Sequence, residues 1–177
     1  MNILKLRYII LFNILLLIGM PVFAQRKQAV KRPALTTVEN NNIKNGIKLK
    51  SNGFKVSEAY LVFDDESNVP EGNKVELNQN VNMLLIIDGG WTETGGRVFP
   101  GSRQEIKLSG GAKILNTDEM FAAFDVTGVS PEDARYITLN AIITDLKIRK
   151  NYVIVNFRVW DKKGKSEING SYKLYIM

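Results

Sequence analysis

Apolar and polar residues alternate over several short stretches of this chain, and alternation of period two is the pattern of β-strands that bury one face. The clearest example is residues 135–164, where two alternating stretches are joined by a short charged segment. The positions expected to be buried are Ile137, Leu139, Ala141 and Ile143 before that segment, and Val153, Val155, Phe157 and Val159 after it. We expect these residues to form a β-hairpin at the centre of an all-β domain.

The second half of this segment also carries aromatic residues on its other face. Tyr152 and Trp160 have the opposite parity to the apolar residues of 153–159, so they point away from the expected core. They predict either a second buried face or an exposed aromatic stripe, and burial beneath loops is the expected arrangement.

Two earlier stretches also have strand patterns. In residues 53–65 the apolar positions change parity near Glu58, which predicts either a strand buried on both faces or a β-bulge. In residues 73–88 the odd positions are mostly apolar, and Leu84 and Ile86 add a second apolar face. This second stretch is therefore expected near the centre of a sheet.

The remaining signals are shorter. Further strands are expected at residues 104–108, 112–115 and 167–177. Residues 116–125 predict a short helix, with an edge strand as the alternative, and Ser130 is expected to cap a helical turn that leads into the hairpin. The fold class is therefore all-β: an immunoglobulin-like antiparallel β-sandwich of seven to nine strands with one or two helical turns. A small β-barrel gives the same pattern and remains the alternative.

The first 24 residues have the pattern of a secretory signal peptide. Lys5 and Arg7 precede an apolar run of about a dozen residues, and Ala24 ends a cleavage motif before Gln25. An uncleaved anchor is the alternative, although the run is shorter than the ~20 residues that span a bilayer. We expect cleavage, no remaining transmembrane segment, and a periplasmic or secreted location in a Gram-negative bacterium.

Residues 25–46 are basic and rich in asparagine, with no sustained apolar period, which predicts a disordered linker before a domain at 47–177. Arg26, Lys27, Lys31 and Arg32 could make weak contact with an anionic surface, and a solvated tail is the simpler expectation. The chain has a formal charge of +6, but residues 48–177 contain 17 basic and 17 acidic residues. A neutral domain argues against nucleic acid as a partner.

The chain contains no histidine and no cysteine. This composition excludes Ser-His-Asp and Cys-His catalysis, thiol redox chemistry and the usual zinc sites. The acidic residues lack the spacing of a known calcium loop and are expected to cap turns. We therefore expect no enzyme activity, no cofactor and no metal.

The glycine-rich segment 88–101 is the candidate binding site. It contains Trp91, Glu93 and Arg97, which could stack on a sugar ring or anchor a partner. In the alternative, Trp91 folds back over an open end of the sandwich. The expected function is a non-catalytic module that binds a protein or glycan. The alternatives are a glycan hydrolase that uses Glu93 and Asp88, or a barrel carrier of an apolar ligand.

Overall fold

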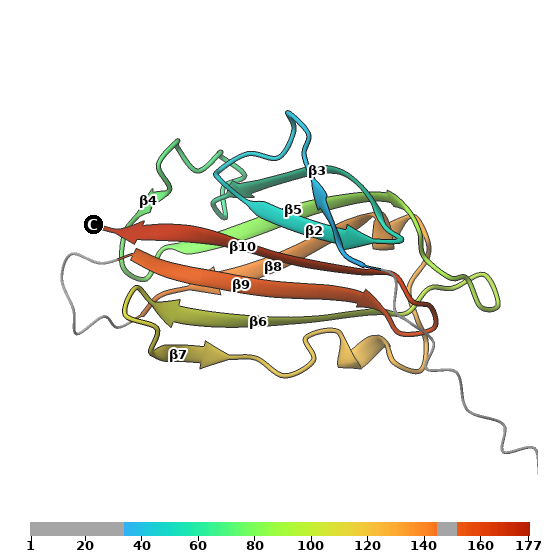
Figure 1. Cartoon of the computed structure of the whole chain (residues 1–177). Helices are drawn as coiled ribbons and strands as arrows, with labels where there is room; N and C mark the ends of the chain where they lie inside the picture. Colours follow the sequence, from blue (N-terminus) through green and yellow to red (C-terminus); the bar gives the residue numbers. More distant parts are fainter. Residues whose placement is uncertain (1–33, 145–151) are drawn as a thin grey trace, which may run out of the picture. The chain divides into compact units, whose positions relative to one another are not determined.

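The computed structural model in Figure 1 describes residues 34–144 and 152–177. The expected signal peptide and the basic residues from Arg26 to Arg32 lie outside this range, so those predictions stand untested. Within the described part of the chain, no helix is long and apolar enough to cross a membrane.

Ten strands form two sheets. The larger sheet has the order β1 (Thr36–Val38), β2 (Lys48–Asn52), β10 (Glu167–Ile176), β9 (Tyr152–Asp161), β6 (Pro100–Leu108) and β7 (Lys113–Asn116), and β4 (Lys74–Val75) pairs in parallel with the end of β10. The smaller sheet has the order β3 (Lys55–Val62), β5 (Asn80–Gly89) and β8 (Tyr136–Ile142). Eight strands have four residues or more, which agrees with the expected seven to nine.

Both sheets contribute alternate residues to one hydrophobic cluster. On β5 the odd residues from Val81 to Ile87 are at most 1% exposed, and on β9 the odd residues from Val153 to Val159 are at most 4% exposed. Two sheets that share a core in this way form a β-sandwich. The all-β prediction is confirmed, while the immunoglobulin-like connectivity stays a prediction.

The expected hairpin at residues 135–164 is wrong. Its two strands, β8 and β9, lie in different sheets: β8 pairs with β5, and β9 pairs with β10 and β6. Both strands bury their odd residues in the same cluster. In the sequence the two strands are separated by nine residues, more than the two to five of a hairpin loop.

The parity change near Glu58 is a β-bulge, one of the two expected possibilities. The pairing of β3 with β5 shifts register on both sides of Val56. The bulge lets Phe54 before it and Ala59 after it point into the same core, although their positions have opposite parity.

The expected disordered linker at 25–46 is wrong for residues 36–46. Strand β1 pairs with β2, and the Asn40 side chain donates to the Ser57 carbonyl at 2.8 Å. Val38 and Ile43 pack against the core, which supplies the apolar burial that the composition seemed to lack. The ordered domain therefore starts before Ile47, near Thr36.

The expected helix at 116–125 is reduced to a 3-10 turn at Ala122–Phe124. Its first residues cannot cap a helix because their side chains hold the segment against β6: Thr117 Oγ1 accepts from the Gln104 amide at 2.7 Å. The second expected turn is present at Asp133–Arg135, where Ser130 Oγ accepts from the Asp133 amide at 3.0 Å.

Candidate functional site

The base of the glycine-rich segment is packed into the domain. The ring of Trp91 is half-buried and lies edge-on against Phe54, with ring centroids 4.5 Å apart. The following amide, Thr92 N, donates to Asp161 Oδ2 at 2.7 Å, and Asp161 is only 4% exposed. Gly90 has a φ of +108°, and a Cβ there would meet the Gly53 carbonyl oxygen at 2.2 Å. These contacts fix the base of the segment against the rest of the domain.

The tip of the segment is a tight, exposed turn. Thr94 and Arg97 exchange two backbone hydrogen bonds, and Gly95 and Gly96 between them both have positive φ, as a type I′ turn requires. The guanidinium of Arg97 donates to the carbonyl of Thr127 at 3.2 Å. Glu93 is exposed at this tip.

The three residues of the predicted site therefore have separate surroundings. The ring of Trp91 is engaged with Phe54, and Arg97 is bonded to the 127–128 backbone. No hydrogen bond or ion pair links Glu93 to Arg97 in the described part of the chain. Asp88, the other residue of the hydrolase hypothesis, is paired with Arg135 at 2.8 Å. Binding through this segment remains a prediction. The side chains of Trp91, Glu93 and Arg97 do not form one shared surface.

The outer surface of the larger sheet is a second candidate site. Alternate residues of four neighbouring strands point away from the core there and lie in register across the sheet. They are Lys48, Lys50 and Asn52 on β2; Glu167, Asn169, Ser171, Lys173 and Tyr175 on β10; Tyr152, Ile154, Asn156, Arg158 and Trp160 on β9; and Gly101, Arg103, Glu105 and Lys107 on β6. We call this set the wide face.

Three hollows adjoin one another on the wide face. Their volumes are about 620, 630 and 330 Å³. The first shares Lys48 and Ser171 with the second, and the second shares Asn156 and Asn169 with the third. The hollows therefore form one continuous depression from the β10 end of the sheet toward β6 and β7.

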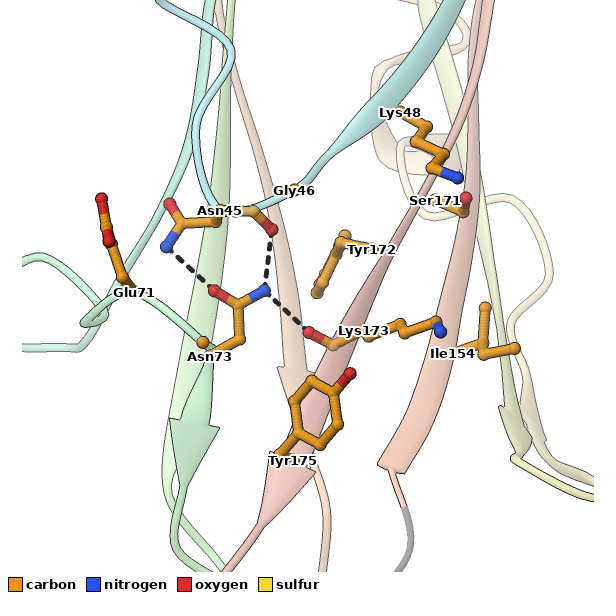
Figure 2. Close-up of a pocket in the computed structure, with 11 residues that line it drawn as sticks. Asn45, Gly46, Lys48, Glu71, Asn73, Ile154, Ser171, Tyr172, Lys173 and Tyr175 are labelled. Carbon is orange, nitrogen blue, oxygen red and sulfur yellow. Dashed lines mark hydrogen bonds between the residues drawn. The ribbon is translucent and has the colours of Figure 1, made fainter.

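An asparagine pair builds the wall of the first hollow (Figure 2). Asn73 Nδ2 donates to the backbone carbonyls of Asn45 at 2.7 Å and Lys173 at 2.8 Å, and Asn45 Nδ2 donates to Asn73 Oδ1 at 3.0 Å. These bonds join two loops to β10 where its partner changes from β2 to β4. Figure 2 shows Lys48, Lys173 and Tyr175 around the hollow.

Both acidic side chains of the wide face are already paired. Glu105 accepts from Lys107 at 2.7 Å and from Lys113 on β7 at 2.5 Å. Hydrogen bonds from these lysines, Lys107 first, hold the pKa of the Glu105 carboxyl below its usual value. Arg158 forms an ion pair with Glu167. Neither of these two carboxylates leaves an unbalanced negative charge on the wide face. At its border, Glu71 lines the first hollow and Glu39 the second, and neither makes an ion pair within the described residues.

The basic side chains of the wide face outnumber the acidic ones by six to two. Four of them make no ion pair within the residues that the structure describes: Lys48, Lys50, Arg103 and Lys173. The domain is neutral in total, yet this surface has a net positive charge. It is suited to an anionic partner.

Aromatic rings lie at both ends of the wide face. Trp160 covers Gly101, where a Cβ would meet the indole at 2.3 Å, and the Arg158 guanidinium lies 5.0 Å from its ring centroid. At the other end the rings of Tyr152 and Tyr175 are 5.5 Å apart. Eight residues at ~3.3 Å each separate Tyr152 from Trp160, a span of ~26 Å. Both rings are half-buried and point outward, so the aromatic stripe is present and only partly covered.

The smaller sheet has a different outer surface. A hollow of about 760 Å³ there is lined by three acidic side chains, Glu58, Asp64 and Glu66, and by one basic side chain, Lys44. The charged side chains that line this hollow are thus mainly acidic, in contrast to those of the wide face. None of the four hollows described here lies between the sheets, so they give the carrier hypothesis no support.

The charge of the wide face was missed by sequence analysis. Parity placed Tyr152 and Trp160 away from the core, but the lysines and arginines come from four strands whose pairing the sequence does not state. Once the sheet order is known, counting the charged residues at the outward-pointing positions of each strand identifies this surface.

Comparison with known proteins gives no family. No family model and no curated protein matches the sequence. Among solved structures, the soluble domain of PmoD from Methylocystis sp. ATCC 49242 (Rockwell) aligns with 81% of this chain and 98% of its own, at 8% identity and a TM-score of 0.37. A similarity at this level carries no argument about fold or function.

Proposed function

We propose that the protein is an exported, non-catalytic binding module that holds an acidic polysaccharide on its wide face. Export rests on the expected signal peptide. The observation that carries the binding proposal is one continuous depression of the larger sheet with four basic side chains that form no ion pair within the described residues: Lys48, Lys50, Arg103 and Lys173.

The chemistry between the aromatic ends favours a sugar polymer over other anions. The carboxamides of Asn156 and Asn169 and the hydroxyl of Ser171 line the hollows, and amides and hydroxyls can both donate to and accept from sugar hydroxyls. Trp160 and Tyr152 present partly covered rings about 26 Å apart, and the Lys173 ammonium lies 4.3 Å from the Tyr152 ring centroid. This spacing suits an extended ligand rather than a compact one. The basic side chains then supply attraction for carboxylate groups along the polymer.

The pairing of Asp88 with Arg135 supports a binding role over hydrolysis. No observation on Glu93 favours the hydrolase alternative, because its side chain stands on an exposed turn.

The test is binding of a polyuronic acid to the chain from Gln25 onward, measured by calorimetry. The variant Lys50→Ala with Arg103→Ala should bind at least about a hundredfold more weakly, since each of the two lost charged contacts is worth about 1.5–3 kcal/mol. The matched control is Lys44→Ala with Lys55→Ala, which removes the same charge from the smaller sheet and should bind within about twofold of the parent.

Three outcomes would contradict the proposal. Equal affinity of both double variants would exclude the wide face. Equally tight binding of a single-stranded oligonucleotide would show that charge alone, without sugar recognition, accounts for binding. Release of reducing ends from the polymer would indicate hydrolysis.

A further inference from the structure

We propose that β8 forms a dimer interface, in which its free edge pairs antiparallel with β8 of a second copy of this chain. The partner surface is distinct from the wide face, because it lies at the edge of the smaller sheet.

The other sheet edges are closed or short. The edge of β3 is occupied: Lys44 N donates to the Ala59 carbonyl at 2.8 Å, and Leu61 N donates to Asn45 Oδ1 at 2.9 Å. Strand β1 has three residues. Strand β7 has four, including Lys113, and its pairing with β6 shifts register. Short length, a lysine and a register shift are common ways in which proteins prevent edge pairing.

Strand β8 has none of these protections. It runs for seven residues, Tyr136–Ile142, in unbroken register with β5, and contains no proline, glycine or charged residue. Within residues 34–144 and 152–177, its backbone pairs with β5 alone, so alternate amides and carbonyls on the other edge have no backbone partner. A long, regular and uncharged edge is a template for another strand.

A second copy fits this edge because the strand is complementary to itself. A two-fold axis at Leu139 places Tyr136, 55% exposed, opposite Ile142 of the second copy, 44% exposed. An aromatic side chain opposite a β-branched one is a favourable cross-strand pair. The same axis places Thr138 opposite Asn140 on the outer surface and Ile137 opposite Ala141 on the core side. No like charges meet in this register.

Pairing along this register produces a continuous six-stranded sheet from two three-stranded ones. In this interface the backbone amides and carbonyls on the free edge of each β8 bond to those of the other copy. The pairing also covers Tyr136 and Ile142, which are the exposed apolar residues of the strand.

The test is sedimentation equilibrium of the chain from Gln25 onward over a concentration series. The parent should dimerise. Thr138→Lys should dimerise at least a few-fold more weakly, because the axis brings the two introduced lysines to ~7–8 Å on diagonal positions. Thr36→Lys, the same change at an exposed site on β1, should remain dimeric and serves as the matched control. Combining Thr138→Lys with Asn140→Glu should restore the dimer, because each lysine then faces a glutamate of the other copy.

A monomeric parent at every concentration overturns the proposal, whether the edge is free or is covered by another part of the chain. A dimerisation constant that is unchanged in Thr138→Lys also overturns it. Hydrogen exchange of the parent provides a measurement that needs no variant: amides on the free edge of β8 should exchange more slowly as protein concentration rises, and rates independent of concentration would contradict the interface.

Discussion

The glycine-rich segment and the wide face both combine aromatic rings with charged side chains, but they use these groups differently. In the glycine-rich segment, the ring of Trp91 contacts Phe54, and the neighbouring amide is bonded to buried Asp161. On the wide face, Trp160 and Tyr152 point outward, and four basic side chains have no acidic partner in the described part of the chain. A tryptophan in a flexible-looking loop is therefore a weaker sign of binding than side chains whose interactions are incomplete.

The largest effect on stability is expected for Trp91→Ala. Removal of the ring from its contact with Phe54 should lower the free energy of unfolding by about 3 kcal/mol, as large-to-small changes at packed sites do. Urea denaturation measures the loss, and calorimetry under folded conditions should show unchanged polysaccharide affinity. Normal stability with lost binding would instead make the glycine-rich segment the site.

Asp161→Ala should cost about 2 kcal/mol. The carboxylate accepts hydrogen bonds from Thr92 N at 2.7 Å and Lys163 N at 2.9 Å, and both amides would lose a partner at a part-buried position. The matched control is Asp65→Ala, an exposed carboxylate that accepts from Ser67, and its effect on stability should be clearly smaller than that of Asp161→Ala. Equal losses in urea denaturation would show that Asp161 does not hold the segment in place.

Trp160→Ala should distinguish most clearly between the glycine-rich segment and the wide face as the binding site. Its ring covers Gly101 from outside the sheet, so the change should cost only about 1 kcal/mol of stability while weakening polysaccharide binding about tenfold or more. Calorimetry and urea denaturation of the same sample give both values. Unchanged affinity would restrict the site to the basic residues.

Glu93→Gln should have the smallest effect. The side chain is exposed on the Thr94–Arg97 turn, so stability should change by less than about 0.5 kcal/mol, and polysaccharide affinity should stay the same. A clear loss of affinity would return Glu93 to the binding site.

Strand positions could be predicted from the sequence, whereas strand partners could not. The parity of Val153 to Val159 identified the buried side of β9, because side chains on a strand alternate with period two. The same parity in residues 137–143 could not show that β8 belongs to the other sheet, since either arrangement buries the same side chains. A short separation in sequence suggested a hairpin, and long-range pairing overrode it.

The order of residues 36–46 was missed for a related reason. Asparagine lowers the expectation of folded structure, because its side chain competes for backbone hydrogen bonds. Here Asn40 and Asn45 make those bonds to β3 and to the loops beside it, so the residues that suggested disorder hold the segment in place. The wide face was missed because its charge depends on which strands pair in the larger sheet, and the sequence does not state these pairings.

The positive charge of the wide face has a consequence for how the domain meets its surroundings. A domain of zero net charge with one positive surface has an electric dipole moment whose positive end is at that surface. Close to an anionic layer, this moment exerts a torque that turns the wide face toward the layer before any contact is made. At physiological ionic strength the guidance acts over ~8 Å, so the domain approaches freely and is aligned only in its final step.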